Sequence, residues 1–345
     1  MSDTPPHPPS EPMSGFTVDP RALPPASARP ATVTAASWML LAAMVLALAV
    51  AVFTFINMAN QLSSGSYAVT PTVLAPLFAI ASVVLMPFIR GGFDGARVTA
   101  FALFGALTMY GLLTAVRTIL AAVVYDGPYE SPLDGGTIIA TLIPLVLGAF
   151  GAVTMALLMG TKASVWFHER RASRRPRASA PPYQRPATSI VVAVLLGTLV
   201  LTTILYFVVA VVLAAPGSRM SYLLPTGVAD LITIVVVTAA AVMVGIGSDV
   251  GRHVSVGLGG FFIGSTIFTF ISFVYVALRF PEYVNMYQLI SLSISVVQGV
   301  IGVGVILMLS GRTTADWYHH RRVGVPAPPP PQQLSTPPTG PNRIP

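Results

Sequence analysis

The sequence predicts an all-α polytopic membrane protein with eight transmembrane helices, arranged as two parallel four-helix repeats between disordered, proline-rich tails. Its 345 residues are 54% hydrophobic and 9% charged, with a mean hydropathy of +0.76, whereas soluble domains have roughly 25% charged residues. Apolar runs long enough to cross about 30 Å of hydrocarbon, roughly 20 residues each, recur along the chain. Similar segments also occur in both halves in the same order, which indicates an internal repeat.

Eight apolar runs mark the predicted helices. They cover residues 37–59, 70–89, 97–122, 137–159, 189–213, 224–246, 254–278 and 287–310. The two ends of the chain are rich in proline and poor in apolar residues, so they cannot bury enough surface to offset the entropy of ordering. We therefore expect a disordered N-tail (1–35), a first membrane unit (36–171), a basic linker (172–187), a second membrane unit (188–322) and a disordered C-tail (323–345).

Positive charge predicts the orientation of these units in the cell membrane. Six arginines lie at or just after the end of the first unit, at positions 170, 171, 174, 175, 177 and 185, whereas the loops at 60–69 and 123–136 contain neither lysine nor arginine. Because cytoplasmic loops carry the excess of basic residues, we expect the linker on the cytoplasmic side. Even numbers of spans separate it from both tails. The N- and C-termini are therefore predicted to be cytoplasmic.

The repeat can be followed through both halves at a nearly constant offset. The matched segments are 29–32 with 185–188 at 156, 94–97 with 249–252 at 155, and 160–171 with 311–322 at 151. Four spans is an even number, so both units have the same orientation. This predicts a pseudo-twofold axis along the membrane normal, as in parallel repeats.

A repeated Trp-aromatic-His-x-Arg-Arg motif ends each half. Its candidate functional residues are Trp166, His168, Arg170, Arg171, Trp317, His319, Arg321 and Arg322. In one interpretation the last helix of each half continues beyond the bilayer as an anchor, with tryptophan in the interface and the arginines reaching phosphates. In the other, the motif binds anionic lipid headgroups on the cytoplasmic face, and histidine adds a pH-dependent charge. No metal site or cofactor is expected, because the chain lacks cysteine and a His-x-x-x-His pair.

A second repeated motif is Asp-x-x-Arg, which occurs at Asp94 and Arg97 and again at Asp249 and Arg252. Each copy lies in a short inner hairpin that leads into the third span of its unit. The carboxylate can cap the helix and pair with the arginine one turn later. Alternatively, the two copies face each other across the pseudo-twofold axis and form a cytoplasmic gate.

Arg117 and Asp230 break the repeat, because the matched residues are Ser272 and Ala75. An ionisable group at the centre of a membrane helix costs roughly 2.5–3.5 kcal/mol, so such groups usually pair or line a wet cavity. One hypothesis is that Arg117 and Asp230 pair between the halves and line or close an outward-facing cavity. In the other, Arg117 reaches the interface and Asp230 caps the sixth span.

Glycines in the fourth and eighth spans predict a helix contact. Gly148, Gly151, Gly299 and Gly302 reduce side-chain bulk on one face of each helix and so permit close approach. We expect these two spans to pack against each other at the pseudo-twofold axis, with Gln298 able to form a hydrogen bond across the contact. A hinge for alternating access is the other interpretation.

No catalytic motif points to an enzyme: the chain lacks the phosphate loop, the Gly-x-Ser-x-Gly elbow and His-Glu-x-x-His. A transferase would rest only on the outer-loop acids Asp126, Glu130 and Asp134. The first functional prediction is a non-enzymatic membrane scaffold or assembly subunit, whose tails recruit cytoplasmic proteins and whose basic face contacts anionic lipids, without nucleic acid. The alternative is a transporter or channel for a small or lipid-like solute, with its path between the two repeats.

Overall fold

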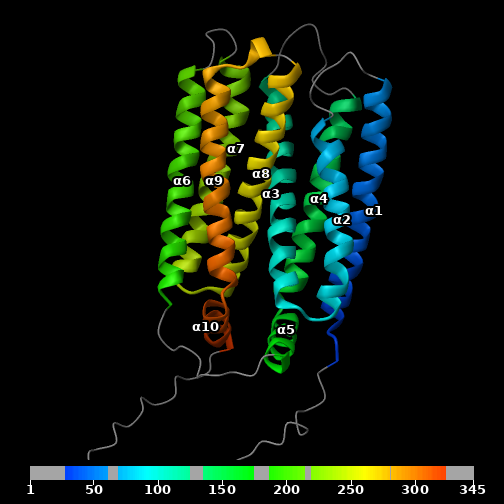
Figure 1. Ribbon diagram of the computed structural model, residues 1–345, viewed down its shortest axis with the longest axis vertical. Helices are drawn as coiled ribbons and strands as arrows, with labels where there is room; N and C mark the ends of the chain where they lie inside the picture. Colours follow the sequence, from blue (N-terminus) through cyan, green and yellow to red (C-terminus); the bar gives the residue numbers. More distant parts are fainter. Residues whose placement is uncertain are drawn as a thin grey trace, which may run out of the picture.

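All regular structure in the described residues is helical (Figure 1). The computed structural model describes residues 28–60, 69–124, 135–174, 186–213, 219–279 and 281–323. Its elements are α1 (Ala31–Asn60), α2 (Val69–Arg90), α3 (Asp94–Val124), α4 (Gly135–Met159), α5 (Thr161–Arg174), α6 (Ala187–Leu213), α7 (Arg219–Gly245), α8 (Asp249–Arg279), the short 3-10 helix η3 (Pro281–Tyr283), α9 (Met286–Ser310) and α10 (Arg312–Val323).

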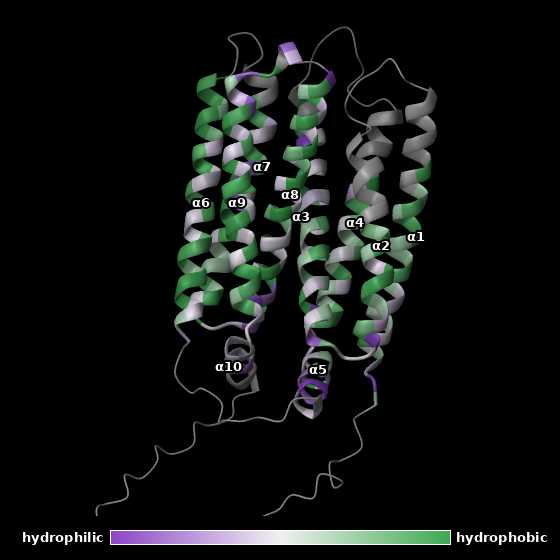
Figure 2. Cartoon of the chain, in the orientation of Figure 1, coloured by the Kyte–Doolittle hydropathy of each residue, from purple (hydrophilic) through white to green (hydrophobic). Residues whose placement is uncertain are grey.

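The long helices have the length and composition of membrane spans. In the described residues, seven of them (α1, α3, α4, α6, α7, α8 and α9) are long and apolar enough to cross a bilayer. In α2 the described apolar stretch is Phe78–Arg90, which is shorter than the candidate membrane spans of the other seven helices. Figure 2 shows hydrophobic residues along the long helices and hydrophilic ones on α5. The predicted all-helical fold with long apolar helices is confirmed and is consistent with a polytopic membrane protein, while the eighth span stays a prediction.

The helices form two groups that meet along α3 and α8. Helices α1 to α4 lie on one side and α6 to α9 on the other, while α5 and α10 lie beyond one end of the bundle (Figure 1). The closest helix pairs within the groups are α3 with α4, α1 with α2, α8 with α9 and α6 with α7. We call the end that carries α5, α10 and the turns 91–93 and 246–248 the turn end.

The two turns have the same backbone structure. Gly92 and Gly247 have φ angles of 76° and 81°, a left-handed conformation that glycine adopts without steric cost. The amide of Gly92 donates to Ile89 O, and that of Gly247 donates to Val244 O, at 3.0 and 3.1 Å. The next amide in each turn bonds five residues back, which completes a Schellman cap. Residues 155 apart therefore end α2 and α7 in the same way.

The helices α4 and α9 do not continue past the bundle. Each stops at a single residue, Gly160 or Gly311, after which α5 or α10 begins. Gly311 has φ −53° and ψ 138°, so the backbone is extended there. The new helices then start with matching hydrogen bonds of 2.9 Å, from Ser164 N to Gly160 O and from Ala315 N to Gly311 O. The expectation of a helix that runs on beyond the bilayer is therefore wrong, because the chain changes direction at both glycines.

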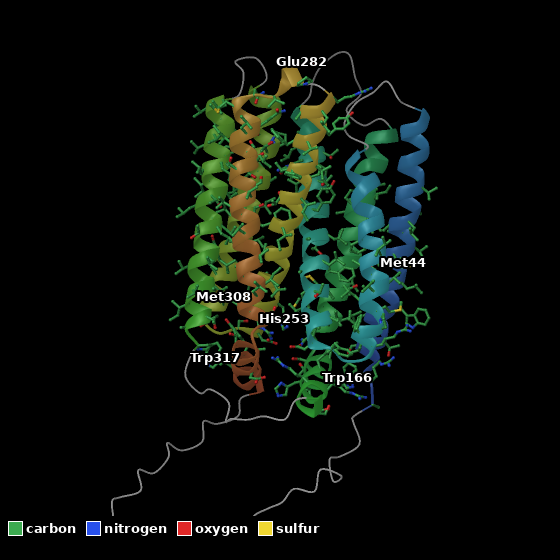
Figure 3. All side chains as sticks on the ribbon, viewed as in Figure 1. Met44, Trp166, His253, Glu282, Met308 and Trp317 are labelled. Carbon is green, nitrogen blue, oxygen red and sulfur yellow. The ribbon has the colours of Figure 1, made fainter. Side chains whose placement is uncertain are left out.

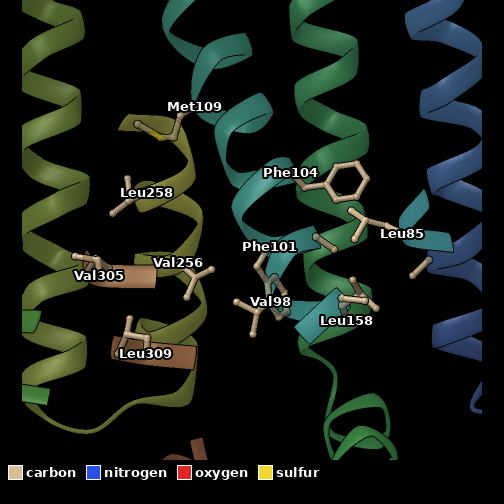
Figure 4. Packing of buried hydrophobic residues seen from close by; sticks show 14 of the residues in the cluster. Leu85, Val98, Phe101, Phe104, Met109, Leu158, Val256, Leu258, Val305 and Leu309 are labelled. Carbon is tan, nitrogen blue, oxygen red and sulfur yellow. The ribbon is translucent and has the colours of Figure 1, made fainter. Parts of the chain in front are cut away.

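Burial follows the same pattern in both halves. The buried residues of α1 include Val33, Ala36, Leu40, Ala43 and Ala47, and those of α6 include Ser189, Val192, Leu196, Leu199 and Thr203. These two sets, the buried stripes of α1 and α6, have the spacing of three and four residues that places side chains on one face of a helix. Each residue in the second list follows its counterpart by 156 positions. Figure 4 shows the buried side chains that fill the space around α3, α4 and α8.

The contact between the two halves is made by backbone. A Cβ atom on Gly105 would lie 2.2 Å from Gly257 Cα, and one on Gly260 would lie 2.0 Å from Ala102 O. At an offset of 155, Gly105 matches Gly260 and Ala102 matches Gly257. Each contact between α3 and α8 therefore has a reciprocal one, the arrangement that a twofold axis produces.

The glycines of α4 and α9 lie at helix contacts, but the partner expected for them is wrong. Gly148 and Gly151 face backbone atoms of α3 at Leu107 and Phe104, while Gly299 faces Thr266 and Gly302 faces Gly259 on α8. Helices α4 and α9 thus each pack inside their own half. The physical reason is that α3 and α8 carry the smallest residues where the halves meet and occupy the central position themselves.

Candidate functional site at the turn end

The two Asp-x-x-Arg copies lie together at the turn end. Asp94 and Arg97 of α3 and Asp249 and Arg252 of α8 line one pocket, which Ser164, His168, Arg171 and Ala315 complete. Its volume is about 20 Å³, enough for about one water molecule. Figure 3 shows the nitrogen and oxygen atoms that gather around the labelled His253 and Trp166 at this end.

The two arginines of the motif bind the ends of membrane helices. Arg97 Nη2 donates to Leu158 O, and Arg252 Nε donates to Leu309 O, both at 3.0 Å. The carbonyls belong to the last turns of α4 and α9, where helix carbonyls have no donor of their own and a cation is favoured by the helix dipole. Arg97 and Arg252 are 4% and 5% exposed. They therefore cap α4 and α9 just before the breaks at Gly160 and Gly311.

The two aspartates of the motif have different partners. Asp94 Oδ2 accepts a hydrogen bond of 3.0 Å from Arg171 Nη1, which ties α5 to the start of α3. Asp249 Oδ1 lies 3.7 Å from Arg252 Nη1 and 3.7 Å from His253 Nδ1. The pairing of aspartate with the arginine one turn later thus occurs only in the second copy, and at a long distance.

A contact between α5 and α10 joins the halves below the bundle. His168 Nδ1 lies 3.9 Å from Asp316 Oδ1, and Asp316 is 8% exposed. Asp316 was not predicted as a site residue, although it lies inside the repeated segment 311–322, directly before the Trp-aromatic-His-x-Arg-Arg motif. Its match in the first half is Val165, so a residue-by-residue comparison of the two copies would have found it.

His253 is a second residue that the sequence analysis missed. It is 2% exposed, and its ring lies 4.3 Å from that of Phe101 on α3, centroid to centroid. His253 Nδ1 lies 2.7 Å from Asp249 O. Because a carbonyl can only accept, this geometry assigns the proton of the neutral ring to Nδ1. The matched residue is Val98, so His253 also marks a place where the copies differ.

The charges of this site balance. We call the set formed by Asp94, Asp249, Asp316, Arg97, Arg171, Arg252, His168 and His253 the dyad cluster. Three carboxylates face three guanidinium groups, so the cluster is formally neutral when both histidines are. Ionic groups with little exposure are stable only when paired in this way. The cluster thereby holds α5 against the start of α3, and α10 against α5.

Burial overturns the lipid-facing interpretation of the two tryptophans. Trp166 and Trp317 are 2% and 6% exposed and pack edge-to-face on Phe167 and Tyr318, at 5.0 and 4.9 Å between centroids. The helix breaks turn these rings under the bundle and away from the bilayer interface. Arg170 lies over the Trp166 ring at 5.6 Å. The side chains of His319, Arg321 and Arg322 lie outside the described part of the structure.

Arg117 and Asp230 do not form an ion pair. Arg117 is exposed on α3, whereas Asp230 is 8% exposed, and the described ion pairs do not include them. The charge of Arg117 still acts on Asp230. Asp230 lies well inside α7, which begins at Arg219. The interpretation of Asp230 as a helix cap is therefore wrong.

Several predicted features lie outside the described residues: most of both tails, linker residues 175–185, and the loop acids Asp126, Glu130 and Asp134. Within the described ranges, no group of three His, Asp or Glu side chains is placed to hold a metal ion. Comparisons of the chain with protein-family models, with curated proteins and with solved structures find no match.

Proposed function

We propose that this chain is a non-enzymatic scaffold of the cell membrane, built from two four-helix repeats, with its turn end and both termini in the cytoplasm. The observation that carries this proposal is the dyad cluster. It ties α5 to the start of α3 and α10 to α5, and α5 leads into the basic linker while α10 leads into the C-tail. The cytoplasmic segments therefore leave the bundle at fixed positions.

Three matched features support the repeat within this proposal. The Schellman caps at Gly92 and Gly247 occupy equivalent positions in the two repeats. The same is true of the arginine caps on Leu158 and Leu309 and of the buried stripes of α1 and α6. The reciprocal contact of α3 with α8 adds a pseudo-twofold relation. With α2 as the eighth span, both repeats begin and end on the side of the turn end, and the axis runs along the membrane normal.

The chemistry of the cytoplasmic segments indicates two kinds of partner. Proline-rich tails favour extended polyproline conformations that protein grooves bind. The linker is rich in arginine, and anionic headgroups attract basic segments that flank membrane helices. The scaffold therefore holds cytoplasmic proteins through its tails and contacts acidic lipids through its linker.

Quantitative cross-linking in intact cells tests this function. Photoreactive groups in the C-tail of the wild type and of the Lys162→Asp variant should capture the same partner proteins. Those in the C-tail of the Arg171→Asp variant should capture fewer. Both changes alter the charge of α5 equally, but only Arg171 holds Asp94. Scrambling residues 324–345 should abolish capture. An identical set of partners in all four proteins would contradict the scaffold function.

Transport is the second candidate, and Asp230 is the observation that favours it. A carboxyl group within a membrane helix is commonly part of an ion or substrate path. The close backbone contact of α3 with α8 fills the space between the repeats, so this candidate places the path within the second half. Flux or lipid movement in proteoliposomes that disappears with Asp230→Asn would support transport. The double variant Arg117→Asp, Asp230→Arg tests whether the two residues pair between the halves. Recovery of the activity lost in each single variant would support that pairing.

A further inference from the structure

Six buried positions of the second half have a polar side chain where the first half has an apolar residue, whereas the reverse holds at Ser37, Ser82 and Thr154. The six polar side chains of the second half, each at most 8% exposed, are Thr203, Asp230, Thr233, Ser291, Ser295 and Gln298. The matched residues of the first half are Ala47, Ala75, Phe78, Ala140, Pro144 and Leu147. Every one of these six differences replaces an apolar residue with one that forms hydrogen bonds. Polar groups are costly in the bilayer core, so these six differences require an explanation.

Three of these side chains lie at similar depths on different helices. At about 1.5 Å per residue, Thr203 on α6, Asp230 on α7 and Gln298 on α9 lie roughly 18–24 Å from the turn end of their helices. That depth is near the middle of helices that are long enough to cross the bilayer. These three residues therefore form a layer in the second half, and Ser291 lies farther along α9, about 29 Å from its turn end.

Direct contacts show that the layer faces the inside of the second half. Gln298 Nε2 donates to Thr203 Oγ1 at 3.3 Å, which joins α9 to α6. On α7, Asp230 belongs to the buried stripe that continues through Thr233, with the spacing of one helix face. A Cβ on Gly227 of α7 would lie 2.8 Å from Phe207 Cε2, so α6 packs beside the Asp230 stripe. Asp230, Thr203 and Gln298 thus point toward a common interior.

Two oxygen atoms in the interior of the second half have no hydrogen-bond partner among the described residues. They are Asp230 Oδ2 and Ser291 Oγ, both buried. An unpaired buried polar group costs about 1–3 kcal/mol, and more when it is charged. These two oxygen atoms can therefore coordinate a bound cation.

No charged side chain in direct contact neutralises Asp230 within the described residues. The charge that acts on it is that of exposed Arg117 on α3, which forms no ion pair with it. Helix α6 has no charged residue, and its titratable side chain is Tyr206. The charges of α8 lie near its ends, with Asp249, Arg252 and His253 at one and Arg279 at the other, and Tyr275 lies between them.

We propose that the second half binds a monovalent cation, sodium or a proton, at Asp230, in an interior that also presents the oxygens of Thr203, Ser291 and Gln298. Hard cations take oxygen ligands. A single positive charge cancels the single carboxylate, whereas a divalent ion would leave a net charge in a medium of low dielectric constant. The proposal is independent of the scaffold function, because it concerns side chains inside the membrane and not the tails.

Carbodiimide labelling of the full-length protein in proteoliposomes tests the site. Dicyclohexylcarbodiimide reacts with protonated carboxyl groups in apolar surroundings, and mass spectrometry locates the adduct. We expect an adduct at Asp230 that is absent from Asp230→Asn. If sodium is the ligand, sodium chloride at ten times its dissociation constant slows labelling about tenfold by mass action, and choline chloride does not. If the proton is the ligand, labelling falls as the pH rises and sodium has no effect.

Thermal unfolding in sodium and in choline is a second measurement, for the case in which the reagent does not reach Asp230. A sodium- or pH-dependent shift of the midpoint that is lost in Asp230→Asn supports the site. The matched controls lie on one helix, because Ser291 is buried and Ser293 is exposed two residues away. Ser291→Ala should weaken the cation effect, and Ser293→Ala should not.

Two results would overturn the proposal. One is labelling of Asp230 that changes with neither sodium nor pH, since the carboxyl group would then be permanently protonated. The other is the absence of both labelling and any cation-dependent shift that requires Asp230.

Discussion

Two glycines one turn apart on α8 test the contact between the halves. Gly260 faces α3 so closely that a Cβ atom would lie 2.0 Å from Ala102 O, whereas a Cβ on Gly264 would meet nothing within 4 Å. Alanine in place of either glycine gains about 0.5–1 kcal/mol of helix stability. The difference between Gly260→Ala and Gly264→Ala therefore isolates the packing of α3 against α8.

The expected magnitude follows from that geometry. Ordinary contact begins near 3.4 Å, so α3 and α8 must separate by about 1.4 Å at this point to admit the methyl group. Overpacking of this kind costs about 1–3 kcal/mol. Denaturant or thermal unfolding in detergent should thus show Gly260→Ala to be about 1–3 kcal/mol less stable than Gly264→Ala. Gly105→Ala should be destabilised to a similar degree, because it occupies the reciprocal position. Equal stabilisation of all three variants would refute the close contact.

Three further predictions concern the dyad cluster, the polar layer and the orientation. Asp94→Asn and Arg171→Ala should each loosen α5 by about 1 kcal/mol, seen as roughly fivefold faster hydrogen exchange of its backbone amides; unchanged exchange would mean that this ion pair does not hold α5. Gln298→Leu should change stability in detergent by less than about 1 kcal/mol, because it removes two long hydrogen bonds and restores the apolar type of the first half; a much larger loss would contradict this. Because the chain contains no cysteine, Glu282→Cys and Ser173→Cys provide single labelling sites, and an impermeant maleimide on intact cells should label only the first; the opposite result would reverse the predicted orientation.

The helices were predictable because hydropathy measures what a bilayer requires. Runs of apolar residues marked each long helix to within a few residues of its ends. The breaks at Gly160 and Gly311 were not predicted, because the residues after them form helices as well and a change of direction leaves no trace in periodicity. The tryptophans that follow were assigned to the bilayer interface for the same reason.

The site was predictable in part. The Asp-x-x-Arg repeat drew attention to four residues that the pocket brings together. Their partners were not predictable, because Leu158 O, Leu309 O and Arg171 are distant in sequence and reach the motif only through tertiary packing. His253 and Asp316 were not predicted because both lie outside the predicted spans 254–278 and 287–310, whereas Arg117 and Asp230 stand out as charges inside apolar runs. His253 and Asp316 also lie where the copies differ.

A contact that repeats itself on both sides of an axis is the kind that two identical subunits make. The seam of α3 with α8 therefore has the form of a homodimer interface contained in one polypeptide. In a true homodimer, every substitution appears twice, so a costly carboxylate such as Asp230 would be buried in both subunits. Covalent fusion removes that constraint. One copy can keep an apolar residue at such a position, while the other accepts a polar residue that serves a function.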